Sequence, residues 1–403
     1  MNVTIRPSVA SGVVDAPPSK SISHRALLCG ALSEGSRVMN VAFSQDIEAT
    51  IRCLQAMGAT VCRDESEVSI GGLDPRLLPD NLCLDCGESG STLRFLLPLC
   101  LLCGKPVTLC GSQRLLERPL DVYERMCAEY GMLFERTRQG ITVCGVLNPG
   151  RYAVSGKVSS QFITGLLYAL SLLEGDSVLE ITDGLESESY VNLPLATMSA
   201  FGVSVRRMDR CYMVPGAGRY HPLEYSVEGD CSNAAFLDAL SLFGGCVKVN
   251  NLMPETAQGD RVYRDMFAAI SGGGREFDLT DCPDLGPIMF AVAAAMGGAR
   301  FTGTARLRIK ESDRIATMAA ELSKFGIQVC ATDNEVIVSP GVLQQPTEPL
   351  CGHNDHRIVM ALCVLCTLTG GTITGAEAVA KSYPDFFDVL RKLQIGLTID
   401  EIG

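Results

Sequence analysis

Runs of apolar residues recur along the chain, each preceded by a few small polar or charged residues. Six segments share this form: SKSISHRALLCGAL from residue 19, ESGSTLRFLLPLC from 88, VSSQFITGLLYAL from 158, GDCSNAAFLDALSLF from 229, CPDLGPIMFAVAAAM from 282 and HNDHRIVMALCVLC from 353. Ser, Asp or Asn stands near the start of each, and these residues cap helix N-termini. Because the apolar positions leave hardly any polar face, we predict six helices that are buried on nearly all sides.

A second kind of segment alternates with the first and has apolar residues at three- and four-residue spacing. Its copies begin at 46, 120, 192, 260, 313 and 384, and most end near a glycine, which is the expected C-cap. We predict amphipathic helices there that cover the outside of each domain. Short alternating runs between the helices predict strands and turns: EVSIGGL, GITVCGV, CYMVPGA and EVIVSPG.

The glycines that end the amphipathic segments reveal a repeat. They are Gly58, Gly131, Gly202, Gly272, Gly326 and Gly396. Successive spacings are 73, 71, 70, 54 and 70 residues, which indicates six copies of a unit with two helices and several strands. A chain of 403 residues is also too long for one ordinary core, so we expect two domains of three units each. An extended solenoid that serves as a scaffold is the alternative.

Composition narrows the possible partners. Hydrophobic residues make up 47% and charged residues 20%, as in a well-packed globular protein, and the net charge is −12. This charge argues against a nucleic-acid partner, although a local basic pocket for a small anion can coexist with it. The nearly uncharged stretch 285–299 is too short to span a membrane, and the N-terminus lacks a signal pattern, so we expect a cytoplasmic protein.

Three CxxC pairs stand among the 18 cysteines, at Cys83/Cys86, Cys100/Cys103 and Cys363/Cys366. The spacing is compatible with zinc. However, the second and third pairs lie in apolar helical segments, where a thiol packs as a small hydrophobic group. Packing is therefore the favoured interpretation, and we expect neither a metal nor another cofactor.

Helix N-termini bind anions through unpaired N–H groups and a partial positive charge. Five of the six predicted buried helices carry suitable side chains at this end: Lys20, Ser21 and Arg25 in the first, Gly90, Ser91 and Arg94 in the second, Ser159, Ser160 and Gln161 in the third, Asp284 in the fifth, and His356 and Arg357 in the sixth. Taken singly, each Ser or Asp could be only a cap and each Arg a surface charge. Their recurrence along a repeat favours a binding site.

Two further stretches add charge. RLRIKESDR (306–314) contains Lys310, Glu311 and Arg314, and AKSYPDFF contains Lys381. The first could be a solvated face with i,i+4 ion pairs. Alternatively, its cations clamp an anion while a carboxylate transfers a proton. Together with the helix N-termini, these groups indicate transfer chemistry on two phosphorylated substrates without a metal.

The ordered set of motifs PPSKSISHRALL, GESGSTLRF, ERPL, VSSQF, PD at 283–284, KESDR, NDHR and AKSYPDFF resembles the EPSP synthase (3-phosphoshikimate 1-carboxyvinyltransferase) family of enolpyruvyl transferases. The motifs run from residue 17 to 387 in the family's order. The related enolpyruvyl transferases that act on UDP-N-acetylglucosamine are the nearest alternative, and SKSISHR counts against them. A catalytically inactive, phosphate-binding relative is a second alternative.

The resemblance implies an enzyme of the shikimate pathway, which leads to chorismate and the aromatic amino acids. The 5-hydroxyl of shikimate 3-phosphate attacks C2 of phosphoenolpyruvate while C3 takes a proton, and the tetrahedral intermediate then loses phosphate. It also implies an α/β (α+β) fold of two inside-out α/β barrels, each with three βαβαββ-type units, buried helices, and outer sheets and helices. The expected domains are 1–14 with 229–403, and 15–228, with hinges near 12–18 and 227–230 that close over the substrates. We expect a monomer.

Site residues also follow from the resemblance. Shikimate 3-phosphate would be bound by Lys20, Ser21, Arg25, Ser159, Ser160, Gln161, Ser187, Asp284 and Lys310. Phosphoenolpyruvate would be bound by Lys20, Gly90, Arg118, Gln161, Arg314, Arg357 and Lys381, with Arg94, His356 and Arg306 in support. Lys20 would take part in catalysis with two carboxylates: Asp284 would accept the hydroxyl proton and Glu311 would deliver a proton to the methylene carbon.

The chain departs from the family's pattern at the glycine loop. Glu88 stands where members commonly have Asn, and Ser91 where they have Thr. Arg306 replaces an Asn that some members use on the shikimate phosphate. We expect activity to survive these changes, with an altered affinity for the inhibitor glyphosate.

Overall fold

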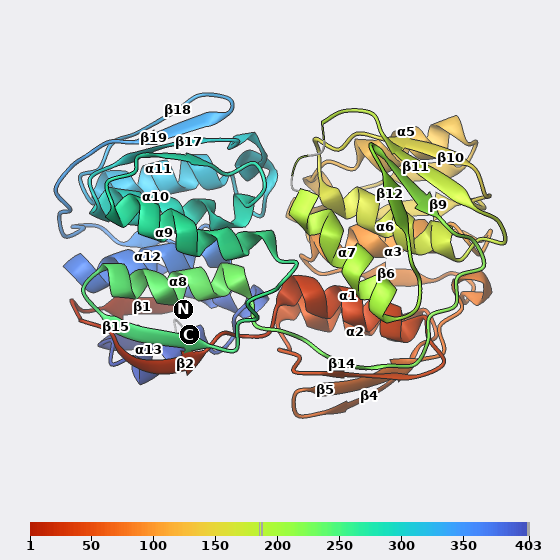
Figure 1. The fold of residues 1–403 in the computed structure, drawn as a ribbon, viewed down its shortest axis with the longest axis horizontal. Helices are drawn as coiled ribbons and strands as arrows, with labels where there is room; N and C mark the ends of the chain where they lie inside the picture. Colours follow the sequence, from red (N-terminus) through yellow and green to blue (C-terminus); the bar gives the residue numbers. More distant parts are fainter. Residues whose placement is uncertain (185, 187, 401–403) are drawn as a thin grey trace. The chain divides into compact units, whose positions relative to one another are not determined.

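The chain divides into two units in the computed structural model, which describes residues 1–184, 186 and 188–400. Unit 1 combines Met1–Pro17 with Gly229–Gly403, and unit 2 is Pro18–Glu228. The chain thus passes from unit 1 to unit 2 after Pro17 and returns after Glu228. Figure 1 shows mixed helices and strands in each unit, with helices inside and sheets on the outside.

The six predicted buried helices are all present. They are α1 (Lys20–Ala31), α3 (Gly90–Cys100) and α6 (Ser160–Ser171) in unit 2, and α8 (Cys231–Leu242), α10 (Gly286–Ala295) and α12 (His356–Thr369) in unit 1. Nearly every residue of each is buried. Close packing is visible at Gly165 of α6, where a Cβ atom would lie 2.3 Å from the carbonyl oxygen of Arg94 in α3. Only glycine allows these two helices to approach so closely.

The six predicted amphipathic helices are present too: α2 (Gln45–Ala56), α5 (Asp121–Glu129), α7 (Glu188–Ala200), α9 (Tyr263–Ser271), α11 (Arg314–Lys324) and α13 (Phe386–Lys392). Four of the predicted C-cap glycines have positive φ, namely Gly58, Gly131, Gly202 and Gly326. Gly272 is the C-cap residue of α9, as predicted, and the left-handed residue after it is Gly273 (φ 93°). The prediction is wrong for Gly396, because Leu393 is the C-cap of α13 and Gln394 (φ 65°) follows it in the left-handed conformation.

Shorter helical pieces complete the chain. They are α4 (Gln113–Glu117) and the 3₁₀ turns η1 (Pro75–Leu77), η2 (Gly259–Val262), η3 (Pro283–Leu285), η4 (Ala305–Ile309) and η5 (Ala376–Lys381).

One strand pattern recurs in the sheets. In the second repeat, β6 (Cys83–Asp85) runs parallel to β7 (Val107–Cys110), and β7 pairs antiparallel with β9 (Ile141–Cys144), whose other neighbour is β8 (Leu133–Arg136). A helix connects β6 to β7, as parallel neighbours require. The same order recurs in β10 (Arg151–Val154), β11 (Ser177–Ile181), β13 (Cys211–Val214) and β12 (Arg206–Met208), and in β16 (Glu276–Asp278), β17 (Ala299–Thr302), β19 (Glu335–Val338) and β18 (Val329–Ala331).

Two repeats exchange their first strands. The strand before α1 is β2 (Ser11–Asp15), yet it pairs in unit 1 with β15 (Cys246–Asn250). Conversely, the strand before α8 is β14 (Glu224–Ser226), and it pairs in unit 2 with β3 (Ser36–Met39), beside β5 (Glu67–Gly71) and β4 (Thr60–Asp64). Each crossing segment is therefore tied to a sheet of the unit that it leaves.

The N-terminus completes the last sheet. Its order is β20 (Leu350–Cys351), β21 (Gly371–Thr374), β1 (Asn2–Ile5) and β22 (Leu397–Asp400). β1 takes the place that the second hairpin strand has in the first, second, third and fifth repeats.

The irregular spacing of 54 residues has a structural cause. α9 ends at Ser271 and β16 already begins at Glu276, so the fourth repeat has no room for a hairpin. Among the described residues, its sheet consists of β2 and β15.

Candidate active site

Asp284 lies in η3, directly before the buried helix α10. Its Oδ1 accepts from Lys310 Nζ at 3.1 Å and from Arg314 Nη1 at 3.0 Å, and its Oδ2 accepts from Arg357 Nη2 at 3.0 Å. Arg357 Nη1 also donates to the backbone oxygen of Asp284 at 3.2 Å. One carboxylate therefore gathers three cations from three different elements.

Arg314 is 1% exposed and links this carboxylate to two more. Its Nη2 donates to Glu311 Oε2 at 2.7 Å, and its Nε donates to Asp355 Oδ2 at 2.9 Å. The alternative of a solvated charged face at 306–314 is thus wrong, because Arg314 is buried and bonded to carboxylates outside its own segment.

These contacts shift the pKa values of Asp284 and Lys310. Burial alone would raise the pKa of Asp284, but Arg357, Lys310 and Arg314 outweigh it and hold the pKa well below its usual value. Burial lowers the pKa of Lys310, against the opposing effect of Asp284, and the neighbouring Arg314 and Arg306 lower it further. Asp284 is therefore a carboxylate in this state and a weak base.

Three further predicted residues of unit 1 are buried. Lys381 is buried at the end of η5, and its Nζ donates to the backbone oxygen of Asn354 at 2.6 Å. His356 is buried in the first turn of α12, with Nδ1 3.9 Å from Asp355 Oδ1. Arg306 is buried as well, near enough to Lys310 to affect its pKa.

In unit 2, Lys20 is the first residue of α1 and bonds to Asp46, a residue that no sequence motif indicated. Its Nζ donates to Asp46 Oδ2 of α2 at 2.8 Å. Arg25 lies one turn later, where Nη1 donates to the backbone oxygen of Ser21 at 2.6 Å and Nη2 to that of Tyr190 at 3.3 Å. Its guanidinium also lies 5.0 Å from the centre of the Phe95 ring, and burial lowers its pKa.

Gly90 opens α3 between two guanidinium groups. A Cβ atom there would lie 2.6 Å from Arg118 Nη1 and 2.7 Å from Arg94 Nη1. Arg94 Nη1 donates to Gln161 Oε1 at 3.0 Å, and Gln161 Nε2 donates to Ser91 Oγ at 2.9 Å. The structure thus brings together the glycine loop, both arginines and the start of α6.

The serines at the start of α6 have different roles. Ser159 caps the helix, with its side chain accepting from the Gln161 N–H, and Ser160 is buried. Ser187 lies outside the described residues.

A chain of hydrogen bonds lies behind these helix starts. His24 Nδ1 bonds Thr50 Oγ1 at 2.7 Å, Thr50 bonds Thr92 at 2.6 Å, and Thr92 donates to Ser89 Oγ at 2.7 Å. Burial, and then the charges of Lys20 and Arg25, lower the pKa of His24 well below its usual value. Neutral His24 thus joins α1 to α2 and α3.

The capping prediction holds for four of the six buried helices. The side chains of Ser89, Ser159, Asp230 and Asp355 accept from backbone N–H groups. Ser19 occupies the N-cap of α1 without a side-chain cap bond. At the fifth helix, η3 takes the place of a cap, so the Asp284 carboxylate is available for the three cations.

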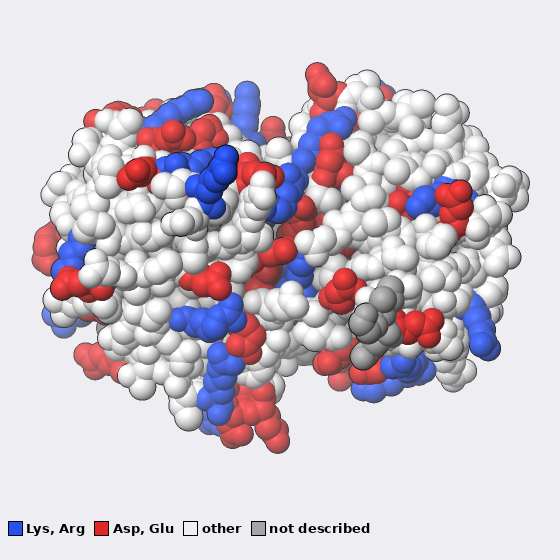
Figure 2. Space-filling model, turned by 180° about the vertical axis from the view of Figure 1, so that it is seen from behind, with Lys and Arg blue, Asp and Glu red and all other residues white. Residues whose placement is uncertain are grey.

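The charged groups of the outer surface are arranged differently. Figure 2 shows acidic and basic side chains interspersed over the face in view. Arg300, for example, is 46% exposed and pairs with Glu335 and Glu276. Such exposed pairs contribute little to stability, whereas the buried cations at the helix starts need a specific reason to be there.

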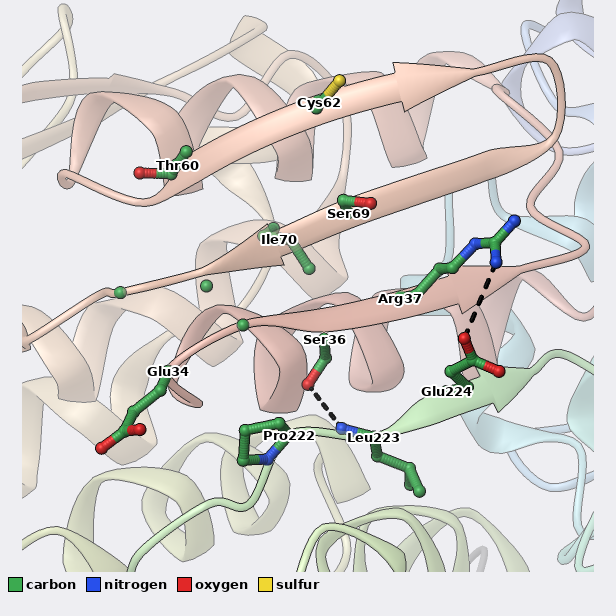
Figure 3. A pocket seen from close by; sticks show the side chains of 13 residues that line it. Glu34, Ser36, Arg37, Thr60, Cys62, Ser69, Ile70, Pro222, Leu223 and Glu224 are labelled. Atoms are coloured by element: carbon green, nitrogen blue, oxygen red, sulfur yellow. Dashed lines mark hydrogen bonds and ion pairs between the residues drawn. The ribbon is translucent and has the colours of Figure 1, made fainter.

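A hollow of about 660 Å³ on the outer face of the sheet formed by β14, β3, β5 and β4 is a poor site for an anion (Figure 3). Its one arginine, Arg37, donates from Nε to Glu67 at 2.8 Å and lies 3.6 Å from Glu224. Its cation is therefore already neutralised.

Among the described residues, no group of three or more potential metal ligands is found. Cys100, Cys363 and Cys366 are buried in α3 and α12, as predicted for packing groups. The prediction is wrong for Cys103, which lies beyond the end of α3 and is half-buried. Within the same described ranges, no helix is long and apolar enough to cross a membrane.

The model of the EPSP synthase (3-phosphoshikimate 1-carboxyvinyltransferase) family matches residues 6–390. The chain belongs to this family. Among curated relatives, the 3-phosphoshikimate 1-carboxyvinyltransferase of Clostridium kluyveri is 39% identical over 429 aligned positions, which cover 99% of this chain and 98% of the relative. That of Clostridium novyi is 37% identical over 433 positions, with the same coverage. The predicted family is therefore confirmed, and the chain is an enzyme of the shikimate pathway.

Solved structures agree on the fold. An EPSP synthase from Acinetobacter baumannii has a TM-score of 0.81 at 21% identity, with all of both chains covered. A second structure of the enzyme from this organism has a TM-score of 0.80 at 23% identity. The predicted two-domain α/β fold is confirmed.

Proposed function

We propose that two groups of side chains act on one pair of substrates in the family's reaction. One group is Asp284 and the cations around it in unit 1, and the other lies at the starts of α1, α3 and α6 in unit 2. The enzyme transfers the enolpyruvyl group of phosphoenolpyruvate to the 5-hydroxyl of shikimate 3-phosphate and releases phosphate. Both substrates are anions, and both groups of side chains are rich in buried cations at helix starts.

The observation that carries this proposal is the Asp284 carboxylate with its three cations. Lys310, Arg314 and Arg357 can exchange Asp284 for substrate phosphate or carboxylate oxygens. Each cation that turns to a substrate weakens the effect that lowers the pKa of Asp284. Asp284 thus becomes a stronger base only when the substrates are bound, and it then accepts the proton of the attacking hydroxyl.

Glu311 carries the second proton transfer in our proposal. Its carboxyl group is 21% exposed and shares Arg314 with Asp284. In its protonated form, Glu311 gives its proton to C3 of phosphoenolpyruvate as the 5-hydroxyl oxygen bonds to C2 and Asp284 takes the hydroxyl proton. The Glu311 carboxylate then takes a proton back from C3 while the bond from C2 to the phosphate oxygen breaks, and the phosphate leaves with the proton that Asp284 held.

The binding roles follow the family's assignment. In unit 2, the groups assigned to shikimate 3-phosphate are Lys20, Ser21, Arg25, Ser159, Ser160, Gln161 and Ser187. Those assigned to phosphoenolpyruvate are Lys20, Gly90, Arg118 and Gln161, together with Arg314, Arg357 and Lys381 of unit 1. The bidentate arginines suit carboxylate and phosphate groups, and lysine acts as a point charge.

The decisive test is phosphate release on mixing the two substrates. The native protein is expected to release phosphate with shikimate 3-phosphate and not with UDP-N-acetylglucosamine, and the Asp284→Ala variant is expected to be nearly inactive. Release with the amino-sugar nucleotide alone would assign the chain to the sibling activity. No release with either acceptor would favour an inactive, phosphate-binding relative.

We also propose that the protein is a cytoplasmic monomer whose two domains, with hinges near 12–18 and 227–230, close when substrates bind. Like charges on the two groups of side chains favour an open state until an anion neutralises them. Small-angle scattering is expected to show a contraction on addition of shikimate 3-phosphate, at a molecular mass of one chain.

A further inference from the structure

Glu321 is a buried carboxylate that the reaction leaves unexplained. It lies in the last turn of α11 and is 2% exposed. Its Oε1 accepts from His353 Nε2 at 2.8 Å, and its Oε2 accepts from Lys324 Nζ at 2.8 Å and from the backbone N–H of Cys351 at 3.0 Å. A carboxylate is buried only where such partners compensate for lost water.

Two of these three partners belong to one turn of the chain. Cys351 ends β20 and residues 352–355 connect it to α12; we call residues 351–355 the turn. Within it, His353 (φ 48°) and Asn354 (φ 52°) are consecutive residues in the left-handed region. Non-glycine residues rarely adopt this conformation, and it persists only where surrounding contacts hold it. Glu321 provides such contacts at Cys351 and at His353.

The turn presents groups that hold the cations of unit 1. The backbone oxygen of Asn354 accepts from Lys381 Nζ at 2.6 Å. The next residue, Asp355, accepts from Arg314 at 2.9 Å and 3.3 Å, and from the backbone N–H of Arg357 at 3.0 Å. A change in the path of this turn would therefore displace the partners of Lys381 and Arg314, and also the backbone at the start of α12, from which Arg357 extends.

We propose that Glu321 is a positioning residue for phosphoenolpyruvate binding, acting through His353 and the 351–355 turn. The inference rests on the proposed function, because that function assigns Lys381, Arg314 and Arg357 to this substrate. Glu321 itself makes no contact with these three cations in its described hydrogen bonds. Its effect reaches them through the backbone.

The chain offers a matched control for a merely stabilising role. Lys324→Met removes one ion pair of Glu321, together with the hydrogen bond from Lys324 Nζ to the backbone oxygen of Pro349 at 3.1 Å, and leaves both contacts of Glu321 with the turn. Glu321→Gln keeps the side chain's size but removes the charge that both contacts use. His353→Asn removes one turn contact while retaining a residue that tolerates positive φ.

The experiment measures kcat and the KM for each substrate by phosphate release. Glu321→Gln is expected to raise the KM for phosphoenolpyruvate about tenfold and to leave the KM for shikimate 3-phosphate within about twofold. His353→Asn is expected to raise the KM for phosphoenolpyruvate about threefold. Lys324→Met is expected to behave like the native protein.

A second readout needs no turnover. Hydrogen exchange of backbone amides in residues 350–357 is expected to accelerate in Glu321→Gln and His353→Asn, and not in Lys324→Met. Faster exchange there in a protein that releases no phosphate would support the positioning of the turn while contradicting the proposed function.

Three results would overturn the inference. One is an unchanged KM for phosphoenolpyruvate in a folded Glu321→Gln variant, and another is an equal rise in the KM for both substrates. The third is an effect of Lys324→Met as large as that of Glu321→Gln. If Glu321→Gln does not fold, His353→Asn decides alone: native KM values and native exchange at 350–357 would then reject the proposal.

Discussion

The buried cations of the two units are held by different kinds of partner. In unit 1, Lys310, Arg314 and Arg357 are bonded to the carboxylate of Asp284, and Arg314 also to those of Glu311 and Asp355. In unit 2, the contacts of Arg25 and Arg94 include backbone oxygens, an amide oxygen and the faces of Phe95 and Phe162.

This difference separates two tasks. Carbonyl oxygens and aromatic rings orient an arginine without neutralising it, so Arg25 of unit 2 is prepared to bind an anion directly, whereas Lys20 is paired with Asp46. Carboxylates pair with Lys310, Arg314 and Arg357 of unit 1, so an anion binds these three cations by replacing a carboxylate partner. The replaced carboxylate is then free to take a proton.

The largest effect on catalysis is expected from Asp284→Asn, which removes the proposed base and keeps the size and shape of the side chain. We expect kcat to fall by about 10²- to 10⁴-fold, while both substrates still bind because the three cations lose a competing negative charge. Steady-state phosphate release and titration calorimetry measure the two quantities. Glu335→Gln, at an exposed ion pair of the same unit, is the control. A kcat within tenfold of native would contradict the role of Asp284.

A smaller effect is expected in unit 2 from Gly90→Ala. The added Cβ would lie 2.6 Å from Arg118 Nη1 and 2.7 Å from Arg94 Nη1, so both guanidinium groups must move. We expect the KM for phosphoenolpyruvate to rise about tenfold with a smaller change in kcat. A fall in kcat at an unchanged KM would show that unit 2 also takes part in the chemical step.

The third prediction concerns stability and pH in unit 2. Because burial lowers the pKa of His24, the unfolded chain binds a proton that the folded chain does not as pH falls below the ordinary value of about 6.5. This group therefore destabilises the fold as pH falls, by up to about 1.4 kcal/mol per pH unit. The loss stops below the folded pKa.

Chemical denaturation between pH 7.5 and 5 measures this slope. His24→Asn is expected to flatten it, and His221→Gln, at an exposed histidine, is expected to leave it unchanged. Equal slopes in His24→Asn and the native protein would contradict a buried neutral imidazole.

The smallest effect is expected at the glycine loop, where Glu88 replaces the family's usual Asn. Glu88→Asn removes a negative charge near the expected anion site, so the inhibition constant for glyphosate is expected to fall by about two- to fivefold, with little change in kcat. An unchanged inhibition constant would contradict the prediction that Glu88 weakens the binding of glyphosate.

Local patterns predicted the helices and the repeat, because burial and amphipathic periodicity are encoded in neighbouring residues. They did not predict the exchange of β2 and β14. From local pattern alone, each strand would join the sheet of the repeat whose helix it precedes. Its actual sheet is decided by its pairing partner, β15 for β2 and β3 for β14, which lies elsewhere in the sequence.

Only part of the candidate site could be predicted, because only some of its residues lie in a local sequence pattern. Lys20, Arg94, Asp284 and Arg314 stand at helix starts and carry a local signal. Asp46 begins an ordinary amphipathic segment, where an acidic residue is common, and its bond to Lys20 joins residues 26 positions apart. Asp355 lay within the quoted NDHR motif, but its bonds to Arg314 depend on packing across the unit.

The exchange of β2 and β14 sets an order for folding during synthesis. Every strand of unit 2 has been made once the ribosome has passed Glu228, because β14 is the last of them. β1 and β2, although made first, find their partners only when β15, β21 and β22 emerge. We therefore expect unit 2 to fold during synthesis while β1 and β2 are still unpaired, because their partner strands have not yet been made.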